Sequence, residues 1–281
     1  LTINWFEEKR DASKPFLMMY LHKAPHRPWW PSPEKFAEFY NKKFPEPETL
    51  FDNYNGRGTA AKTAEMNILT HMQYMHDSKI RPSTLESMEK VEPEIKYIRG
   101  ESVVRPGPNG FMGPFNRAND DQKRKYNVTL DKINADFKNN WPLMNDKEKM
   151  SWKFQRYMQD YLATISSVDD NVGRVLNYLD ENKLSRNTIV VYTSDQGFYL
   201  GEHGWFDKRF IYDESFKTPL LVRWPNQIKP GTTSDEMVQN LDFAQTFLEA
   251  AMINIPDDMQ GESLMPLFTG NNEKWDREEV Y

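Results

Sequence analysis

The most regular hydrophobic pattern in the chain lies between residues 161 and 179. Apolar side chains recur there at intervals of three and four, at Tyr161, Ile165, Val168, Val172, Val175, Leu176 and Leu179. Such spacing puts them on one face of an α-helix, so it predicts a long amphipathic helix. The polar run 182–187 then predicts where that helix ends.

Short apolar runs elsewhere predict strands at Phe16–Leu21, Thr188–Thr193 and Pro219–Pro225. The second run is β-branched and continuously apolar, which is typical of a parallel strand covered on both faces. Further helices are predicted over about 33–41, after Pro31, and over 241–251. Because helices and strands alternate, the chain is predicted to have an α/β fold.

Residues 44–150 are the least regular third of the chain and mix amphipathic stretches with turn-rich ones. We interpret them as an elaborated insertion on one edge of the main domain. At 281 residues, the chain is long enough for one large or two small domains.

The composition of the chain argues against several classes of protein. Aromatic residues make up 14% of the chain, which predicts a packed core rather than disorder. The net charge is −6, which argues against a nucleic-acid binder with a basic face. No apolar run approaches the roughly 18 residues of a membrane span. Cysteine is absent, so the chain itself holds no disulfide, zinc–thiolate site or cysteine nucleophile.

The densest group of polar residues follows the predicted strand at 188–193. Asp195 and Gln196 come first, and both offer oxygen ligands of the kind that hard cations such as Ca²⁺ and Mg²⁺ take. Ligands bind beyond the carboxyl ends of strands in open α/β sheets, and these residues stand at such an end. An ordinary turn residue capping the strand is the alternative for Asp195.

Cationic residues stand in two candidate loops. Lys208 and Arg209 could hold an anion such as sulfate or phosphate, or could be solvated loop charges. His26, near Lys23, could bind an oxyanion or act as a general acid, or could be a structural loop histidine. Trp29 and Trp30 could stack on a sugar, although packing is the more usual role of such a pair.

Taken together, these blocks resemble the formylglycine-dependent (type I) sulfatases of the alkaline phosphatase superfamily. The resemblance rests on Lys23–Pro28, on Val168–Gly173 within the long helix, on Asn187–Gly197, on Leu200–Gly204 with Asp207–Arg209, and on Asn240–Thr246 with Gly261–Leu267. It covers 1–43 and 150–270 well and 44–150 weakly. It implies a mixed, mostly parallel sheet sandwiched between helices, with 1–270 as a partial catalytic domain and 271–281 as the start of a C-terminal subdomain.

The resemblance also implies roles for individual residues. Asp195 and Gln196 match ligands of the family's Ca²⁺, for which Mg²⁺ is the alternative. Lys208 matches the lysine that touches the sulfate, and His26 matches the histidine at the sulfate and its leaving oxygen. Lys23, His203 and Arg209 are candidates for contact with substrate.

Part of the family pattern is absent from these residues. The formylglycine arises from a Cys or Ser in the motif C/S-x-P-x-R, and the chain's Ser13-Lys14-Pro15 has Leu17 where the motif needs Arg. The first metal-binding Asp pair is absent as well. The resemblance therefore implies that the nucleophile lies upstream of Leu1 and that this chain alone is inactive. A periplasmic or secreted location is implied by resemblance only.

The implied activity is hydrolysis of a sulfate ester on a saccharide, in the manner of N-acetylglucosamine-6-sulfatases and other enzymes that degrade glycosaminoglycans. Two alternatives remain open at this point. One is a phosphodiesterase or phosphonate hydrolase of the same superfamily, because phosphate and sulfate have nearly the same shape. The other is a module that binds sulfated glycans without catalysis.

Overall fold

The computed structural model describes residues 1–88 and 113–280, which form two units. Unit 1 consists of Leu1–Val175 with Phe198–Phe216, and unit 2 consists of Leu176–Gly197 with Lys217–Tyr281. Residues 89–112, which belong to the predicted insertion, lie outside the described residues. None of the described helices combines the length and the apolar character needed to cross a membrane.

Unit 1 is built mainly from helices. Its helices are α1 (Thr2–Glu8), α2 (Pro33–Phe39), α3 (Thr59–Thr63), α4 (Ile68–His71), α5 (Pro82–Glu86), α6 (Gly113–Arg117), α7 (Asp120–Asn140), the 3₁₀ turns Trp141–Leu143 and Glu202–Gly204, α9 (Asp213–Phe216) and the larger part of α8 (Asp146–Glu181). Its sheet is the antiparallel pair β2 (Tyr199–Leu200) and β3 (Phe206–Asp207).

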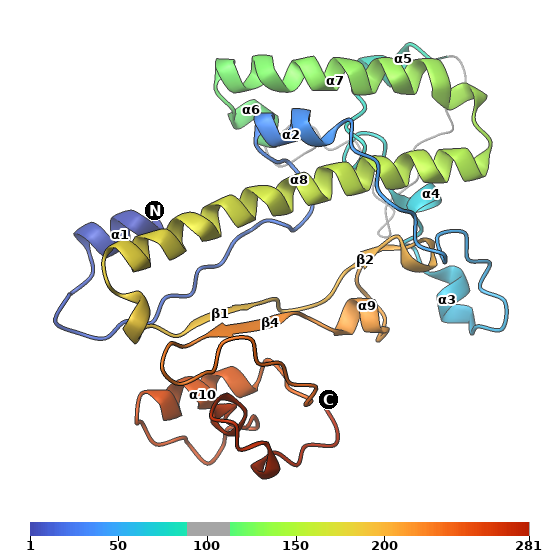
Figure 1. Cartoon of the computed structure of the whole chain (residues 1–281). Coiled ribbons are helices and arrows are strands. Elements are labelled where there is room, and N and C mark those ends of the chain that lie inside the picture. Colours follow the sequence, from blue (N-terminus) through green and yellow to red (C-terminus); the bar gives the residue numbers. More distant parts are fainter. Residues whose placement is uncertain (89–112, 281) are drawn as a thin grey trace. The chain divides into compact units, whose positions relative to one another are not determined.

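The helices α2 and α7 lie side by side in Figure 1. Phe36 of α2 and Phe137 of α7 are almost fully buried in a cluster that also contains Trp141. The helix predicted at 33–41 is confirmed as α2, and the Ser32 hydroxyl accepts a hydrogen bond from the Lys35 N–H at 3.3 Å, as expected of an N-cap.

The predicted long helix is confirmed, but α8 begins at Asp146, well before the start of the apolar pattern at Tyr161. Phe154 and Tyr157 are each 1% exposed, so this first part of the helix is core. The hydrophobic pattern does not reveal this part of the core, because the charged residues Lys153, Arg156 and Asp160 are buried there as well. A hydrophobicity pattern treats such residues as solvent-facing.

Unit 2 contains the remaining elements. They are the end of α8, the 3₁₀ turn Ser185–Asn187, β1 (Val190–Thr193), β4 (Leu220–Arg223), α10 (Asp242–Ala250), α11 (Met265–Phe268) and the 3₁₀ turn Asn272–Lys274. The buried Asp242 carboxylate accepts two hydrogen bonds from the Arg277 guanidinium at 2.5 and 2.9 Å. This ion pair joins α10 to the chain that follows the last turn.

The strands predicted at 188–193 and 219–225 are confirmed as β1 and β4. The sequence predicted a parallel strand at 188–193, but its neighbour among the described residues is antiparallel. β1 pairs with β4 antiparallel, with Val190 opposite Arg223 and Thr193 opposite Leu220. Leu221 is 64% exposed, so the described residues do not cover the pair on both faces. A continuous apolar run indicates a buried strand, but it does not determine whether the neighbouring strand is parallel or antiparallel.

The strand predicted at Phe16–Leu21 is wrong for the described residues, because this segment forms no strand. The exposed fraction alternates along it, with Leu17, Met19 and Leu21 exposed and the residues between them half-buried. A strand exists only when a neighbour exchanges backbone hydrogen bonds with it, and nothing within 1–88 or 113–280 pairs with this segment.

A buried charge network holds α8 against the segment before α5. The Lys79 ammonium lies 2.7 Å from Oδ2 of Asp160, and Arg156 Nη2 lies 2.6 Å from Oδ1. The side chains are at most 5% exposed. Burial lowers the pKa of Lys79, and the Asp160 carboxylate opposes that shift.

We predict that Asp160→Asn lowers the free energy of unfolding by about 3–5 kcal/mol, because it leaves buried cations without their counter-charge. Urea unfolding of the protein measures the change. Asp121→Asn is the matched control, since Asp121 pairs with Lys125 at the surface and its loss costs at most about 1 kcal/mol. Equal effects of the two substitutions would contradict the role assigned to the buried network.

Candidate functional site

The loop that carries His26 is held by hydrogen bonds on both sides of that residue. The His26 N–H donates to the Lys23 carbonyl at 2.9 Å, which closes a turn. His26 Nδ1 lies 2.7 Å from the Arg27 carbonyl oxygen. Because a carbonyl oxygen only accepts hydrogen bonds, Nδ1 carries the hydrogen and Nε2 remains for a ligand. Both His26 and Lys23 are exposed.

The tryptophans beside this loop are packing residues. Trp29 is fully buried, and its indole N–H donates to the Pro25 carbonyl at 2.8 Å, which fixes the loop just before His26. Trp30 packs against Phe36 and Tyr126, in the cluster of α2 and α7. Of the two roles considered for this pair, the structure favours packing over stacking on a sugar.

The second candidate loop is the turn between β2 and β3 and the residues after it. Gly201 has φ +106°, and a Cβ at this position would lie 2.6 Å from the Phe154 ring, so both the backbone and the packing require glycine. β3 ends at Asp207, and the next two residues are the predicted anion-binding pair. Lys208 is half-buried, with Nζ 5.6 Å from the centre of the Phe198 ring, whereas Arg209 is exposed.

Asp207 lies between these two cations and the hairpin. Its carboxylate is 3.4 Å from Lys208 Nζ and 2.8 Å from Arg209 Nη2. The acid therefore sets where both positive charges lie, immediately beyond the end of β3.

Both loops rest on one cluster of aromatic side chains, which we call the Trp29 cluster. Its members used here are Trp29, Tyr157, Tyr161, Phe198 and Phe206. The rings of Trp29 and Phe198 are 6.4 Å apart between centres, and the Arg27 guanidinium lies 5.3 Å from the centre of the Phe206 ring. Segments more than 160 positions apart in the sequence thus share one support.

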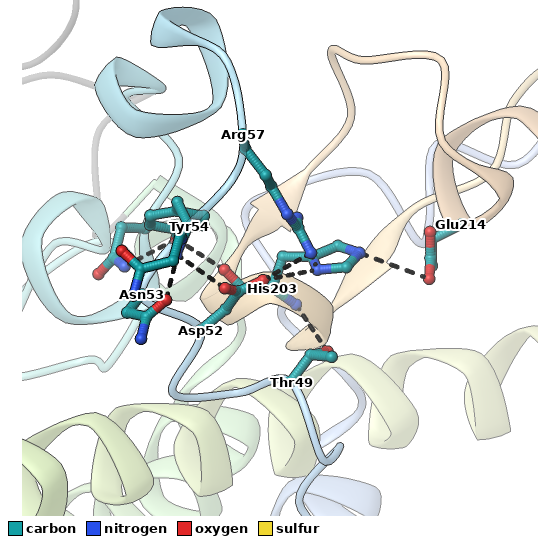
Figure 2. A network of polar contacts seen from close by, with 9 residues as sticks. Thr49, Asp52, Asn53, Tyr54, Arg57, His203 and Glu214 are labelled. Carbon is teal, nitrogen blue, oxygen red and sulfur yellow. Dashed lines mark hydrogen bonds and ion pairs between the residues drawn. The ribbon is translucent and has the colours of Figure 1, made fainter.

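His203 stands at the centre of the polar network in Figure 2. Its backbone N–H donates to the Thr49 hydroxyl at 2.9 Å, and its carbonyl accepts from the Tyr54 hydroxyl at 2.7 Å. These bonds hold a residue with φ +58°, a conformation that is uncommon outside glycine. The network therefore ties the segment 49–57 to the turn between β2 and β3.

The His203 ring is enclosed by charged groups. Nδ1 lies 3.1 Å from Asp52 Oδ2 and 3.0 Å from Arg57 Nη1, and Nε2 lies 4.0 Å from a Glu214 oxygen (Figure 2). Arg57 also pairs with Asp52 at 2.8 Å. The His203 side chain is 13% exposed, so the geometry favours a supporting role for this ring in the turn that precedes Lys208.

The pKa of the Asp52 carboxyl is held below its usual value. Burial alone would raise this pKa, but the hydrogen bonds from the Tyr54 N–H and from His203, together with the charge of Arg57, outweigh it. Nδ1 of His203 can form either of two hydrogen bonds. A protonated Nδ1 donates to the ionised Asp52, and an unprotonated Nδ1 accepts from Arg57.

Asp195 and Gln196 belong to unit 2 and directly follow β1. Asp195 is exposed and Gln196 is half-buried, and the Asn240 side chain lies 3.4 Å from the carbonyl oxygens of Ser194 and Asp195. Their oxygen donors suit a hard cation, but Ca²⁺ takes six to eight ligands. Among residues 1–88 and 113–280 there is no group of three or more His, Asp or Glu side chains placed to hold a metal.

Several residues around the candidate loops were not singled out from the sequence. They are Asp52, Tyr54, Arg57, Asp77 and Glu214. All except Glu214 lie in the irregular third of the chain. No periodicity or motif links them to residues that are more than 140 positions away, as Asp52 and Tyr54 are from His203.

Comparison with known proteins shows which enzymes the chain resembles. The family model of the C-terminal part of N-sulphoglucosamine sulphohydrolase matches residues 201–281. The chain is 43% identical to an N-acetylglucosamine-6-O-sulfatase of Bacteroides thetaiotaomicron, over 93% of this chain and 44% of that protein. It is 39% identical to the N-acetylglucosamine-6-sulfatase of Bos taurus, over 40% of this chain and 20% of that protein.

A solved structure, described as bound to its substrate D-glucosamine-2-N,6-O-disulfate, matches with a TM-score of 0.83 and 42% identity. The match covers 95% of this chain and 50% of that one. The chain thus spans about half the length, or slightly less, of these relatives. The α/β, alkaline phosphatase-like fold class predicted from the sequence is confirmed.

The resemblance inferred from the sequence is confirmed as well, and it extends into the segment 44–150, where the sequence motifs were weak. Over nearly its whole length, the chain is related to the sulfatases of the alkaline phosphatase superfamily.

Proposed function

We propose that the protein containing this chain hydrolyses the sulfate ester at O6 of a glucosamine residue in a sulfated saccharide. The observation that carries the proposal is that the His26 loop and the β2–β3 hairpin, which leads to Lys208, rest on the same Trp29 cluster. A lysine and a histidine supported in this way suit a bound oxyanion. The choice of sugar is supported by the relatives, which are glucosamine 6-sulfatases.

Lys208 would stabilise negative charge on the sulfate oxygens. Lys208 is half-buried, and the aromatic ring of Phe198 lies 5.6 Å from Nζ, so the charge is less screened than at an open surface. Such a group favours the transition state when more charge develops there than in the bound ester.

His26 would donate a proton to the oxygen that leaves the sulfur. The Arg27 carbonyl keeps the hydrogen on Nδ1, so Nε2 is the atom that would face the ester and, in the imidazolium form, deliver the proton. A sugar alkoxide is a poor leaving group and needs that proton. Lys23 and Arg209, both exposed beside these residues, would contact the saccharide or its charges.

The sulfatase relatives imply a formylglycine nucleophile and a divalent metal. The formylglycine, which forms from a side chain of the enzyme, would supply the attack on sulfur, and the bound metal would stabilise charge at the sulfate. Asp195 and Gln196 would give two oxygen ligands to Ca²⁺ or Mg²⁺. We also propose a periplasmic or secreted location and a sulfated saccharide as partner, by analogy with the family.

Comparing the hydrolysis of a sulfate ester with that of a phosphate ester tests both the proposal and the alternative of a phosphate or phosphonate hydrolase. The intact protein is expected to release sulfate from N-acetylglucosamine 6-sulfate and to turn over the matching 6-phosphate at least about 100-fold more slowly in kcat/KM, because transition-state binding sets specificity. Faster turnover of the phosphate ester would overturn the proposal. Binding of both esters without turnover would favour a non-catalytic glycan-binding module.

For Lys208, we predict that Lys208→Ala lowers kcat/KM in the intact protein by about 100-fold or more, because a group that stabilises developing negative charge is lost. Lys132→Ala is the control, since Lys132 is an exposed residue of α7. Steady-state kinetics of sulfate release measures both. A Lys208→Ala variant as active as the control would exclude Lys208 from the site.

For His26, the leaving group decides the outcome. We expect His26→Ala to lower kcat/KM about 100-fold for the sugar sulfate and less than about tenfold for nitrophenyl sulfate, whose phenolate leaves without a proton. The two rates are measured on one preparation of the variant. If both substrates lose the same factor, His26 positions the sulfate and is not the acid.

A further inference from the structure

Asp77 and Arg27 form a buried ion pair that has no part in the proposed reaction steps. Arg27 Nε donates to Asp77 Oδ1 and Arg27 Nη2 to Oδ2, each at 2.5 Å, in a two-pronged contact. The Gln73 N–H also donates to Oδ2 at 2.7 Å. The Asp77 side chain is 1% exposed and that of Arg27 is 13% exposed. Paired contacts of this kind fix direction as well as distance.

The ionised state of Asp77 follows from its partners. Burial by itself would raise the pKa of the Asp77 carboxyl, but the charge and hydrogen bonds of Arg27, together with the Gln73 N–H, hold it below the usual value. The neighbouring His76 has its pKa lowered to about 4 by burial, so it is neutral near pH 7. Arg27 is therefore the cation that balances Asp77.

Arg27 touches both candidate loops. Its backbone carbonyl accepts from His26 Nδ1, and its guanidinium lies 5.3 Å from the centre of the ring of Phe206, two residues before Lys208. The side chain of Arg27 is thus held by Asp77, and its backbone carbonyl holds the imidazole of His26. On the opposite side of His26, Trp29 fixes the Pro25 carbonyl.

We propose that Asp77 is a positioning residue: through Arg27, it sets the orientation of the His26 imidazole and its place relative to the β3 end that carries Lys208. The inference deepens the proposed function and rests on it for its kinetic consequence. It assigns a role in the reaction to a buried residue of the irregular third of the chain, which is distant in the sequence from both candidate loops.

A spectroscopic test examines the positioning without relying on catalysis. In the intact protein labelled with ¹⁵N-histidine, at about pH 8 where a free imidazole is neutral, the His26 signals should report hydrogen on Nδ1. His26→Gln assigns them, because the His26 signals disappear from the spectrum of that variant. Asp77→Asn should move the signals toward the mixed tautomers of an unrestrained ring.

Asp160→Asn is the matched control, because it makes the same chemical change at an equally buried aspartate that pairs with Lys79 and Arg156 instead. It should leave the His26 signals in place. Arg27→Lys keeps the positive charge but loses the two-pronged contact, so it should move them as Asp77→Asn does and serves if that variant does not fold. Unmoved signals in Asp77→Asn or Arg27→Lys, or equal movement in Asp160→Asn, would overturn the proposal.

Kinetics then separates this inference from the proposed function. Asp77→Asn should lower kcat/KM for the sugar sulfate about tenfold or more, and for nitrophenyl sulfate by clearly less, because a misplaced acid matters only when the leaving group needs a proton. Combined with His26→Ala, it should cost little more than His26→Ala alone. If the signals move but both substrates lose the same factor, the positioning stands and the acid role of His26 fails.

Discussion

The candidate site depends on one packing constraint, the burial of Trp29 and Phe206 in the same aromatic cluster. Trp29 is fully buried and Phe206 is 4% exposed, and each lies within three residues of a predicted catalytic residue. A close-packed cluster transmits position, because a shift of one ring displaces its neighbours. The loops on its surface can therefore present His26 and Lys208 from distant parts of the sequence without direct contact between them.

Buried ion pairs, together with the aromatic packing, determine how the segments around the site are arranged. Two buried ion pairs make different connections: Arg27 with Asp77 connects the His26 loop to the segment 72–80, and Lys79 with Asp160 connects Lys79 to α8. Buried pairs of this kind contribute little net stability compared with apolar replacements, but leaving one member unpaired is costly. They favour one arrangement over others, which is what a site that must align several groups requires.

Elements with strong local signals could be predicted from the sequence. The long helix follows from its apolar spacing, and α2 follows from Pro31 and Pro33. The start of α8 could not be predicted, because its buried Lys153, Arg156 and Asp160 read as surface positions. The direction of β1 and the state of Phe16–Leu21 depend on which backbone lies alongside, and local sequence carries no such information.

The same division applies to the site. His26, Lys208 and Arg209 stood out because they occupy short motifs that resemble a family. Asp52, Arg57 and Asp77 did not, because each acts through a contact with a residue far away in the sequence or through a turn of irregular backbone. A single sequence reports spacing along the chain, whereas these roles are set by distances across the fold.

A crystal structure of the intact protein with N-acetylglucosamine 6-sulfate bound would test the central claim most directly. The account predicts that the sulfate lies within hydrogen-bond distance of both His26 Nε2 and Lys208 Nζ, with the sugar O6 toward His26. A sulfate that contacts only one of these groups, or that binds away from the loops on the Trp29 cluster, would contradict the account.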